Sequence, residues 1–311
     1  MILSLAPMEG ITTCFFRKVY STYYGGIDRY YTPFLANPNL SAKDLLEISP
    51  EQNQNLPLVP QILTNRTDTF LAIVNHLVDF GYQEVNLNLG CPSGTVVSKK
   101  RGAGMLADYD LLNRFLSEIF EKCPISISIK TRIGISDLSE WDSILPIFEQ
   151  YPIKELIIHP RLQKELYKGI PHMDVYHKTA ESTSLPLCYN GNITSPQDYS
   201  SFLKQVPACQ HIMIGRGVLG NPYLPNALKG EEFPSSIHQS RQVRDTFFSF
   251  HNALLDEYRS YMKGGEQQVL FKMKELWYYM APFAEIDDKS IKKIRKSKTI
   301  SEYMSILQPF Q

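Results

Sequence analysis

Hydrophobic residues along the first two thirds of the chain occur in short runs, with room for a helix between most of them. The eight runs lie at residues 2–6, 29–34, 58–63, 84–89, 126–130, 155–159, 187–190 and 211–215. Between them, apolar residues recur at helical spacing, as Phe70, Val74, Leu77 and Val78 do. Strand followed by helix, repeated eight times, predicts a (β/α)8 TIM barrel of the α/β class. A doubly wound open sheet is disfavoured because no GxGxxG follows the first run.

The last quarter of the chain has a different pattern. Residues 240–311 contain no convincing strand, whereas 241–262 and 268–280 carry apolar residues at helical spacing. Proline and glycine at 222–234 are typical of a linker. We therefore predict a barrel domain over residues 1–235 and a small C-terminal helical domain over 236–311.

Composition and charge narrow the class of protein. The 311 residues contain 32 basic and 32 acidic side chains, so any site for a polyanion must be a local patch. The five cysteines are scattered without a CxxC pair, which argues against disulfides and structural zinc. The N-terminus lacks a basic leader, and no run approaches the roughly 18 apolar residues that span a bilayer. We expect a cytoplasmic monomer with no metal and no membrane contact.

The strand ends carry the candidate chemistry, because TIM-barrel sites lie at the C-terminal ends of the strands. Taken singly, each of these side chains is more often an ordinary core or surface residue. Together they form one convergent set, which has no carboxylate pair and no Ser-His-Asp order. Such a pocket suits an anionic or electron-rich cofactor. The set comprises Pro7, Met8, Glu9, Gln61, Asn88, Lys130, His159 and Asn190.

Residues 84–92 read EVNLNLGCP and draw attention to Cys91. Side chains of a strand alternate between its faces, so Asn86 and Asn88 share the face opposite to the leucines. Two amides suit the polar mouth of a barrel, and Cys91 follows directly. Taken alone, Cys91 is more often an inert buried thiol.

The last two strands are followed by small residues that favour phosphate binding. NGN at 190–192 and GRG at 215–217 lie where barrels of this kind hold phosphate. Either motif alone is usually a turn, but phosphate at one end and lysine with histidine at the other match flavin mononucleotide, FMN. Asn190, Gly191, Asn192, Gly215 and Arg216 are the candidates.

The sequence resembles the tRNA-dihydrouridine synthases through APMEG at 6–10, NLNLGCP at 86–92, RGAGML at 101–106, IKTRIG at 129–134, IIHPR at 157–161 and MIGRG at 213–217. The resemblance implies reduction of uridine in tRNA by FMN, which NADPH reloads, with Cys91 as proton donor. It also implies that FMN lies against Pro7, Met8, Glu9, Gln61, Lys130, His159, Asn190, Gly191, Asn192, Gly215 and Arg216. Gly94 and Pro160 depart from the family pattern; the second bears on the placing of Arg161.

A uridine within folded RNA must leave its stack to be reduced, so the protein must also hold tRNA. The basic stretch KSIKKIRKSK at 289–298 is the strongest cue, although such a run is usually a solvated face. We expect Trp277, Tyr278 and Tyr279 to be core residues, since adjacent residues of a helix face different ways. Candidate tRNA contacts are Asn88, Lys99, Lys100, Arg101, Lys292, Lys293 and Lys296.

Two other functions remain open at this point. An FMN-dependent barrel reductase of a free pyrimidine or enone shares the fold and cofactor but has little use for a basic helical domain. A non-catalytic RNA-binding protein on a barrel scaffold is opposed by the intact set of cofactor residues. Dependence of turnover on RNA separates the first alternative, and a colourless purified protein favours the second.

Overall fold

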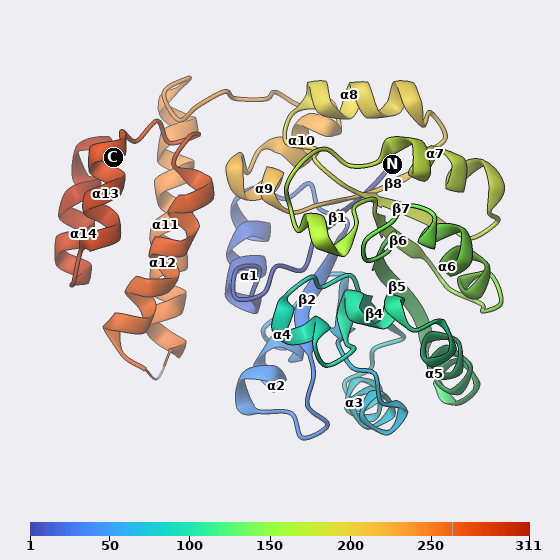
Figure 1. Cartoon of the computed structure of the whole chain (residues 1–311). Coiled ribbons are helices and arrows are strands. Elements are labelled where there is room, and N and C mark those ends of the chain that lie inside the picture. Colours follow the sequence, from blue (N-terminus) through green and yellow to red (C-terminus); the bar gives the residue numbers. More distant parts are fainter. Residues whose placement is uncertain (263) are drawn as a thin grey trace.

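A computed structural model describes residues 1–262 and 264–311, and within these ranges eight parallel strands close into a barrel in chain order (Figure 1). The predicted TIM barrel is confirmed. β1 and β8 close the ring, with Leu3 opposite Ile212. The strands are β1 Ile2–Leu5, β2 Arg29–Leu35, β3 Leu58–Ile62, β4 Glu84–Leu89, β5 Ser126–Arg132, β6 Leu156–His159, β7 Leu187–Asn190 and β8 His211–Ile214.

Helices cover the outside of the barrel. In α3, Phe70, Val74 and Leu77 pack inward as predicted, whereas Val78 is exposed. The covering helices are α1 Cys14–Tyr23, α2 Ala42–Ile48, α3 Thr67–Asp79, α5 Tyr109–Lys122, α6 Glu140–Phe148, α7 Met173–Ser182 and α8 Pro196–Gln205. Shorter helices lie in the loops: α4 Gly94–Val97, α9 Arg216–Gly220, α10 Leu224–Leu228 and the 3-10 helices Gly102–Ala107 and Gln163–Glu165.

The inward side chains of the strands form layers along the barrel axis, because alternate residues point inward. The middle layer is a separate buried cluster made of Ala6, Tyr31, Val59, Ile157, Cys188 and Met213. It divides a polar layer at the N-terminal ends of the strands from a second polar layer at their C-terminal ends.

The polar layer below the middle cluster is a network of paired groups. His211 contacts the Ser4 hydroxyl at 2.6 Å through Nε2 and the Glu155 carboxylate through Nδ1. Arg29 lies 3.4 Å from Glu155 and 2.6 Å from Glu84. Atoms of Glu155, Cys188 and His211 suitable for metal binding lie within 4.8 Å of one another, yet both ring nitrogens of His211 already have partners.

The C-terminal segment is helical, as predicted. It contains α11 Arg241–Tyr261, α12 Glu266–Met280, α13 Asp288–Lys296, α14 Ile300–Leu307 and the 3-10 helix Gln308–Phe310. The predicted boundary at residue 235 falls between α10 and α11 and stays a prediction. Among the described residues, no helix combines the length and apolarity that crossing a membrane requires.

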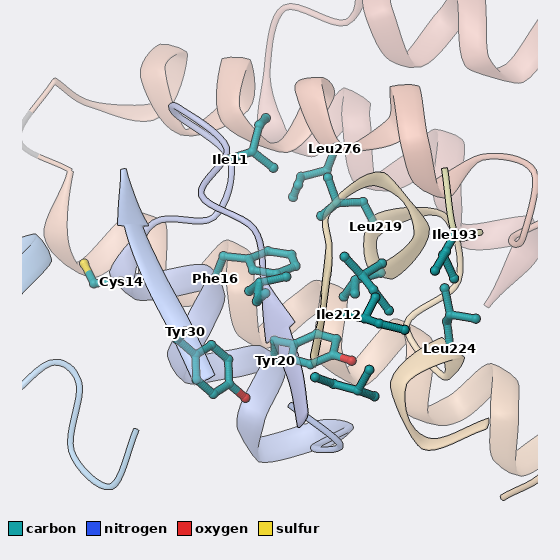
Figure 2. Packing of buried hydrophobic residues seen from close by; sticks show 14 of the residues in the cluster. Ile11, Cys14, Phe16, Tyr20, Tyr30, Ile193, Ile212, Leu219, Leu224 and Leu276 are labelled. Atoms are coloured by element: carbon teal, nitrogen blue, oxygen red, sulfur yellow. The ribbon is translucent and has the colours of Figure 1, made fainter. Parts of the chain in front are cut away.

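The helical segment packs against α1 of the barrel through α11. Phe16 meets Phe250 edge to face at 5.9 Å, and Lys18 pairs with Glu257 at 2.7 Å. Figure 2 shows buried side chains from both parts of the chain, among them Phe16 and Leu276, in one cluster. The aromatic and aliphatic contacts hold α12 beside the open end of the barrel, where the candidate site lies.

Candidate active site

A cavity of about 440 Å³ opens at the C-terminal ends of the strands. It lies where TIM barrels carry their sites, and strand ends, loops and α12 contribute to its wall. The structure brings together twelve of the predicted site residues in this wall: Pro7, Met8, Glu9, Gln61, Asn88, Cys91, Lys130, His159, Asn190, Gly191, Gly215 and Arg216.

A row of side-chain amides leads from the barrel interior to the cysteine. Gln61 Nε2 donates to Asn86 Oδ1 at 2.8 Å, and Asn88 Nδ2 donates to Gln61 Oε1 at 2.7 Å. Asn88 Oδ1 in turn accepts the backbone N–H groups of Gly90 at 3.0 Å and Cys91 at 2.9 Å. Asn88 therefore positions the Cys91 backbone, while its predicted contact with tRNA stays a prediction.

The loop that carries Cys91 is fixed from three further directions. Arg132 Nε donates to the Gly90 carbonyl at 3.0 Å, and Gln163 Nε2 donates to the Pro92 carbonyl at 3.0 Å. Gly102 has a φ of +54°, and a Cβ there would lie 2.9 Å from the Cys91 carbonyl oxygen, so only glycine fits. The half-buried Cys91 thiol thus reaches the cavity from a rigid loop.

Lys130 on β5 and His159 on β6 lie in a strongly positive surrounding, with Arg132 directly opposite His159 in the strand register. Burial and the neighbouring Arg132 lower the pKa of Lys130 to about 8. Burial, with Lys130 next in importance, holds the pKa of His159 well below its usual range. Arg161 Nη1 lies 2.9 Å from His159 Nε2. A guanidinium only donates, so Nε2 is the acceptor and the ring proton sits on Nδ1.

The residues after β7 and β8 that were predicted to hold phosphate are linked by hydrogen bonds, while their phosphate binding stays a prediction. Arg216 Nη2 donates to Asn192 Oδ1 at 2.7 Å, and Arg161 Nη1 donates to the same oxygen at 3.2 Å. Asn192 is exposed and lies outside the cavity wall, where its amide oxygen ties the two arginines together. A Cβ on Gly215 would lie 3.2 Å from Met8 Sδ, in space that belongs to the cavity. Among the described residues, the cavity wall contains three basic side chains, Lys130, Arg132 and Arg216, and one carboxylate, Glu9. This excess of positive charge suits an anion.

Sequence reasoning missed Arg132 and Arg161. Both are fully buried. β5 continues to Arg132, two residues beyond the predicted strand end, so the alternation that selected Lys130 would also have selected Arg132. Arg161 lies in the loop that follows β6. Although Pro160 departs from the family pattern, Arg161 still contacts the His159 ring.

The expectation that Trp277, Tyr278 and Tyr279 are all core residues is wrong for Tyr278, whereas Tyr279 is half-buried and packs against the core. Trp277 is buried, but Tyr278 is 72% exposed, and both tyrosines belong to the cavity wall. Successive residues of a helix are about 100° apart, so burying Trp277 turns Tyr278 outward. Tyr167, from the loop after β6, also lines the entrance and was not predicted.

The predicted basic contacts lie outside the cavity wall. Lys99 is exposed, Lys100 pairs with Asp108 at 2.8 Å, and Arg101 Nε donates to Asn65 Oδ1 at 3.4 Å. On α13, Ile291 and Ile294 face inward, which leaves Lys292, Lys293 and Lys296 exposed. These residues could therefore contact only a ligand that extends beyond the cavity.

Comparison with known proteins adds independent information. The model of a family described as dihydrouridine synthase (Dus) matches residues 4–298. A tRNA-dihydrouridine synthase B from Pasteurella multocida (strain Pm70) is 31% identical over 229 residues, covering 71% of this chain and 66% of that relative. A tRNA-dihydrouridine(16) synthase from Neisseria meningitidis serogroup A is 29% identical over 255 residues, covering 79% and 74%. Morphinone reductase has a TM-score of 0.51 at 9% identity over 75% of this chain and 86% of its own, a likeness of fold alone.

Proposed function

The chain belongs to the dihydrouridine synthase family, and from that premise we propose that it reduces uridines of tRNA to 5,6-dihydrouridine with FMN and NADPH. The observation that carries this proposal is the cavity itself. It joins a rigidly held thiol at Cys91, a cationic wall at Lys130 and a glycine-bearing cradle at Arg216. The proposed place of the reaction is the cytoplasm, where tRNA is processed.

The residues of the cavity fit FMN. Gly215 leaves room against Met8, and Arg216 and Asn190 lie beside it to hold a phosphate group. Lys130 and the Nδ1–H of His159 would face the flavin ring. When bound, FMN supplies the hydride for C6 of uracil. Lys130 would stabilise negative charge on the reduced ring, because a nearby cation offsets such charge in a low-dielectric site.

Cys91 supplies the proton that the reaction needs at C5 of uracil. An ordinary thiol is mostly protonated near neutral pH, so it serves as an acid without an activating base. The amide of Asn88 and the guanidinium of Arg132 hold the Cys91 loop in place. This constraint would keep the sulfur on one side of the cavity, so that a bound base could reach both the thiol and the cofactor.

The proposal is tested with the purified protein. We expect flavin absorption in the visible spectrum and NADPH-dependent formation of dihydrouridine on an unmodified tRNA transcript, with no turnover of free uridine. Turnover of free uridine or an enone without RNA would instead favour the free-substrate reductase. A colourless protein that does not take up added FMN and still binds tRNA would favour the non-catalytic alternative.

The exposed lysines of α13 are proposed to hold the tRNA backbone together with Lys99, Lys100 and Arg101. Changing Lys292, Lys293 and Lys296 to glutamine should weaken tRNA binding and reduce its log-log salt slope by about 0.9 for each lost phosphate contact. The matched control replaces the exposed Lys122, Lys178 and Lys204 on α5, α7 and α8. Equal slopes for both triple variants would show that α13 is only a solvated surface.

A further inference from the structure

The loop between β6 and α7 is held on both sides of one exposed aromatic residue, Tyr167. Arg132 donates to the carbonyls of Leu162 at 2.9 Å and Leu166 at 2.6 Å. Arg161 donates to the carbonyls of Lys168 at 3.1 Å and Gly169 at 2.7 Å. Buried guanidinium groups are costly unless their donors are used, and here they are used to fix the backbone around Tyr167.

The backbone next to Tyr167 is also strained. Leu166 has a φ of +54°, a left-handed conformation that residues other than glycine rarely adopt. Its side chain is 43% exposed, so burial contributes little to offset this strain. Strain of this kind is common at ligand clamps, and its effect here is to point Tyr167 over the cavity.

The ring of Tyr167 is rigidly placed yet largely open to solvent. It lies 5.4 Å from the Arg132 guanidinium carbon, 5.5 Å from that of Arg216 and 6.1 Å from the His159 ring. Nevertheless, Tyr167 is 57% exposed. An aromatic side chain with ordered cationic neighbours and an accessible ring is suited to receive a ligand that arrives from solvent.

A second exposed tyrosine reaches the same entrance from the helical segment. Tyr278 of α12 lines the cavity and contacts Tyr279 edge to face at 5.0 Å. α12 is anchored at two residues that precede Tyr278: Trp277 Nε1 donates to the Tyr303 hydroxyl at 2.5 Å, and Lys272 Nζ donates to the Gly10 carbonyl at 3.1 Å. Tyr278 is therefore presented to the entrance from a fixed helix.

We propose that Tyr167 and Tyr278 are base-stacking residues, which hold the nucleotides flanking the target uridine at the cavity entrance. This inference rests on the proposed reduction of uridine in tRNA. The target base must reach Cys91 and Lys130 inside the cavity. Residues at the cavity entrance therefore meet the nucleotides that precede and follow the target uridine in the RNA chain. Exposed aromatic rings beside positive charge are the combination with which proteins grip single-stranded nucleic acid.

The test compares leucine and phenylalanine at each position. Tyr167→Leu and Tyr278→Leu should each weaken binding of an unmodified tRNA transcript by about tenfold or more, the size expected for one lost stack. Tyr167→Phe and Tyr278→Phe keep the ring and should bind nearly as the parent does. Tyr109→Leu on α5 replaces an exposed tyrosine outside the cavity wall and serves as the matched control.

Salt dependence and flavin content identify the kind of contact that is lost. A lost stack weakens binding by the same factor at low and high salt, whereas a lost phosphate contact changes the salt slope. Parental affinity in both leucine variants would overturn the proposal, as would equal losses in leucine and phenylalanine variants. Loss of affinity that follows loss of bound flavin would overturn it too, because the rings would then be cofactor contacts.

The same samples separate this inference from the proposed function. If the parent forms dihydrouridine and the leucine variants bind tRNA like the parent, the stacking assignment fails and the reaction stands. If instead the parent binds tRNA but forms no dihydrouridine with FMN and NADPH, the proposed reaction fails. The stacking assignment still stands if the leucine variants, and not the phenylalanine variants, bind tRNA more weakly than the parent.

Discussion

The two ends of the barrel contain similar side chains and use them in opposite ways. At the N-terminal ends of the strands, Glu155 lies between Arg29 and His211, so the charged groups meet partners within the protein. At the C-terminal ends, Lys130 lies near Arg132 and His159, and Glu9 is the only carboxylate among the described residues of the cavity wall. Charges that are paired stabilise a fold, whereas like charges gathered around a cavity favour an anionic ligand.

The apolar middle layer keeps these two ends independent. Tyr31, Ile157 and Met213 fill the barrel between them. Substitutions at the open end should therefore alter ligand binding and catalysis with little loss of stability, and substitutions at the closed end should do the reverse. Each of the following changes tests that division.

The largest effect is expected at Cys91. Cys91→Ala removes the proposed proton donor, and loss of a positioned general acid typically lowers a rate by ~10²–10⁴-fold. Bound FMN and its reduction by NADPH should persist, since that half-reaction does not use the thiol. Dihydrouridine on unmodified tRNA is measured beside NADPH oxidation. Parental dihydrouridine rates would return Cys91 to the class of inert thiols.

At the closed end, Glu155→Gln should lower the free energy of unfolding by about 3 kcal/mol, because it removes the carboxylate that the buried His211 and the half-buried Arg29 share. Urea unfolding measures the change. The matched variant is Glu9→Gln at the open end. Burial raises the pKa of Glu9, so an amide there is tolerated and stability should hardly change. Equal losses in the two variants would contradict the division.

The affinity for reduced FMN, whose ring carries a negative charge, should depend on pH through Lys130, whose pKa is lowered to about 8. An anionic ligand binds the protonated lysine better, so affinity falls as pH rises above about 8, by at most about tenfold per pH unit for one proton. Lys130→Met should remove this dependence, which anaerobic titration of reduced FMN between pH 7 and pH 9.5 will show. Arg216→Ala, in contrast, should weaken FMN binding throughout and keep the slope. A Lys130→Met variant with the parental pH profile would place the titrating group elsewhere.

The smallest effect is expected in the middle layer. The Tyr31 hydroxyl is buried and has no hydrogen-bonding partner among the described residues. Tyr31→Phe should therefore leave stability within about 0.5 kcal/mol or increase it, since no bond is lost. Tyr20→Phe is the control: its hydroxyl donates to the Pro222 carbonyl at 2.8 Å, and its loss should cost about 1 kcal/mol. A larger loss for Tyr31→Phe would reveal an unrecognised partner.

Local periodicity was sufficient to predict the barrel and the side chains at its strand ends. Alternation placed Asn88, Lys130 and His159 on inward faces, and the structure brings all of them into the cavity wall. Periodicity says nothing about loops or about packing between distant segments. Arg161 and Tyr167 depend on the course of one loop, and Tyr278 depends on how α12 packs against the barrel, so these positions became visible only in three dimensions.

The bond from Lys272 to the Gly10 carbonyl has a thermodynamic consequence. It joins α12, which carries Tyr278, to the loop that carries Glu9 in the cavity wall. If tRNA bound along α12 favours one arrangement of that loop, it changes the affinity for FMN by some factor. Linkage is reciprocal, so FMN must then change the affinity for tRNA by the same factor. Under the proposed function, this bond would couple flavin binding in the cavity to RNA binding along α12.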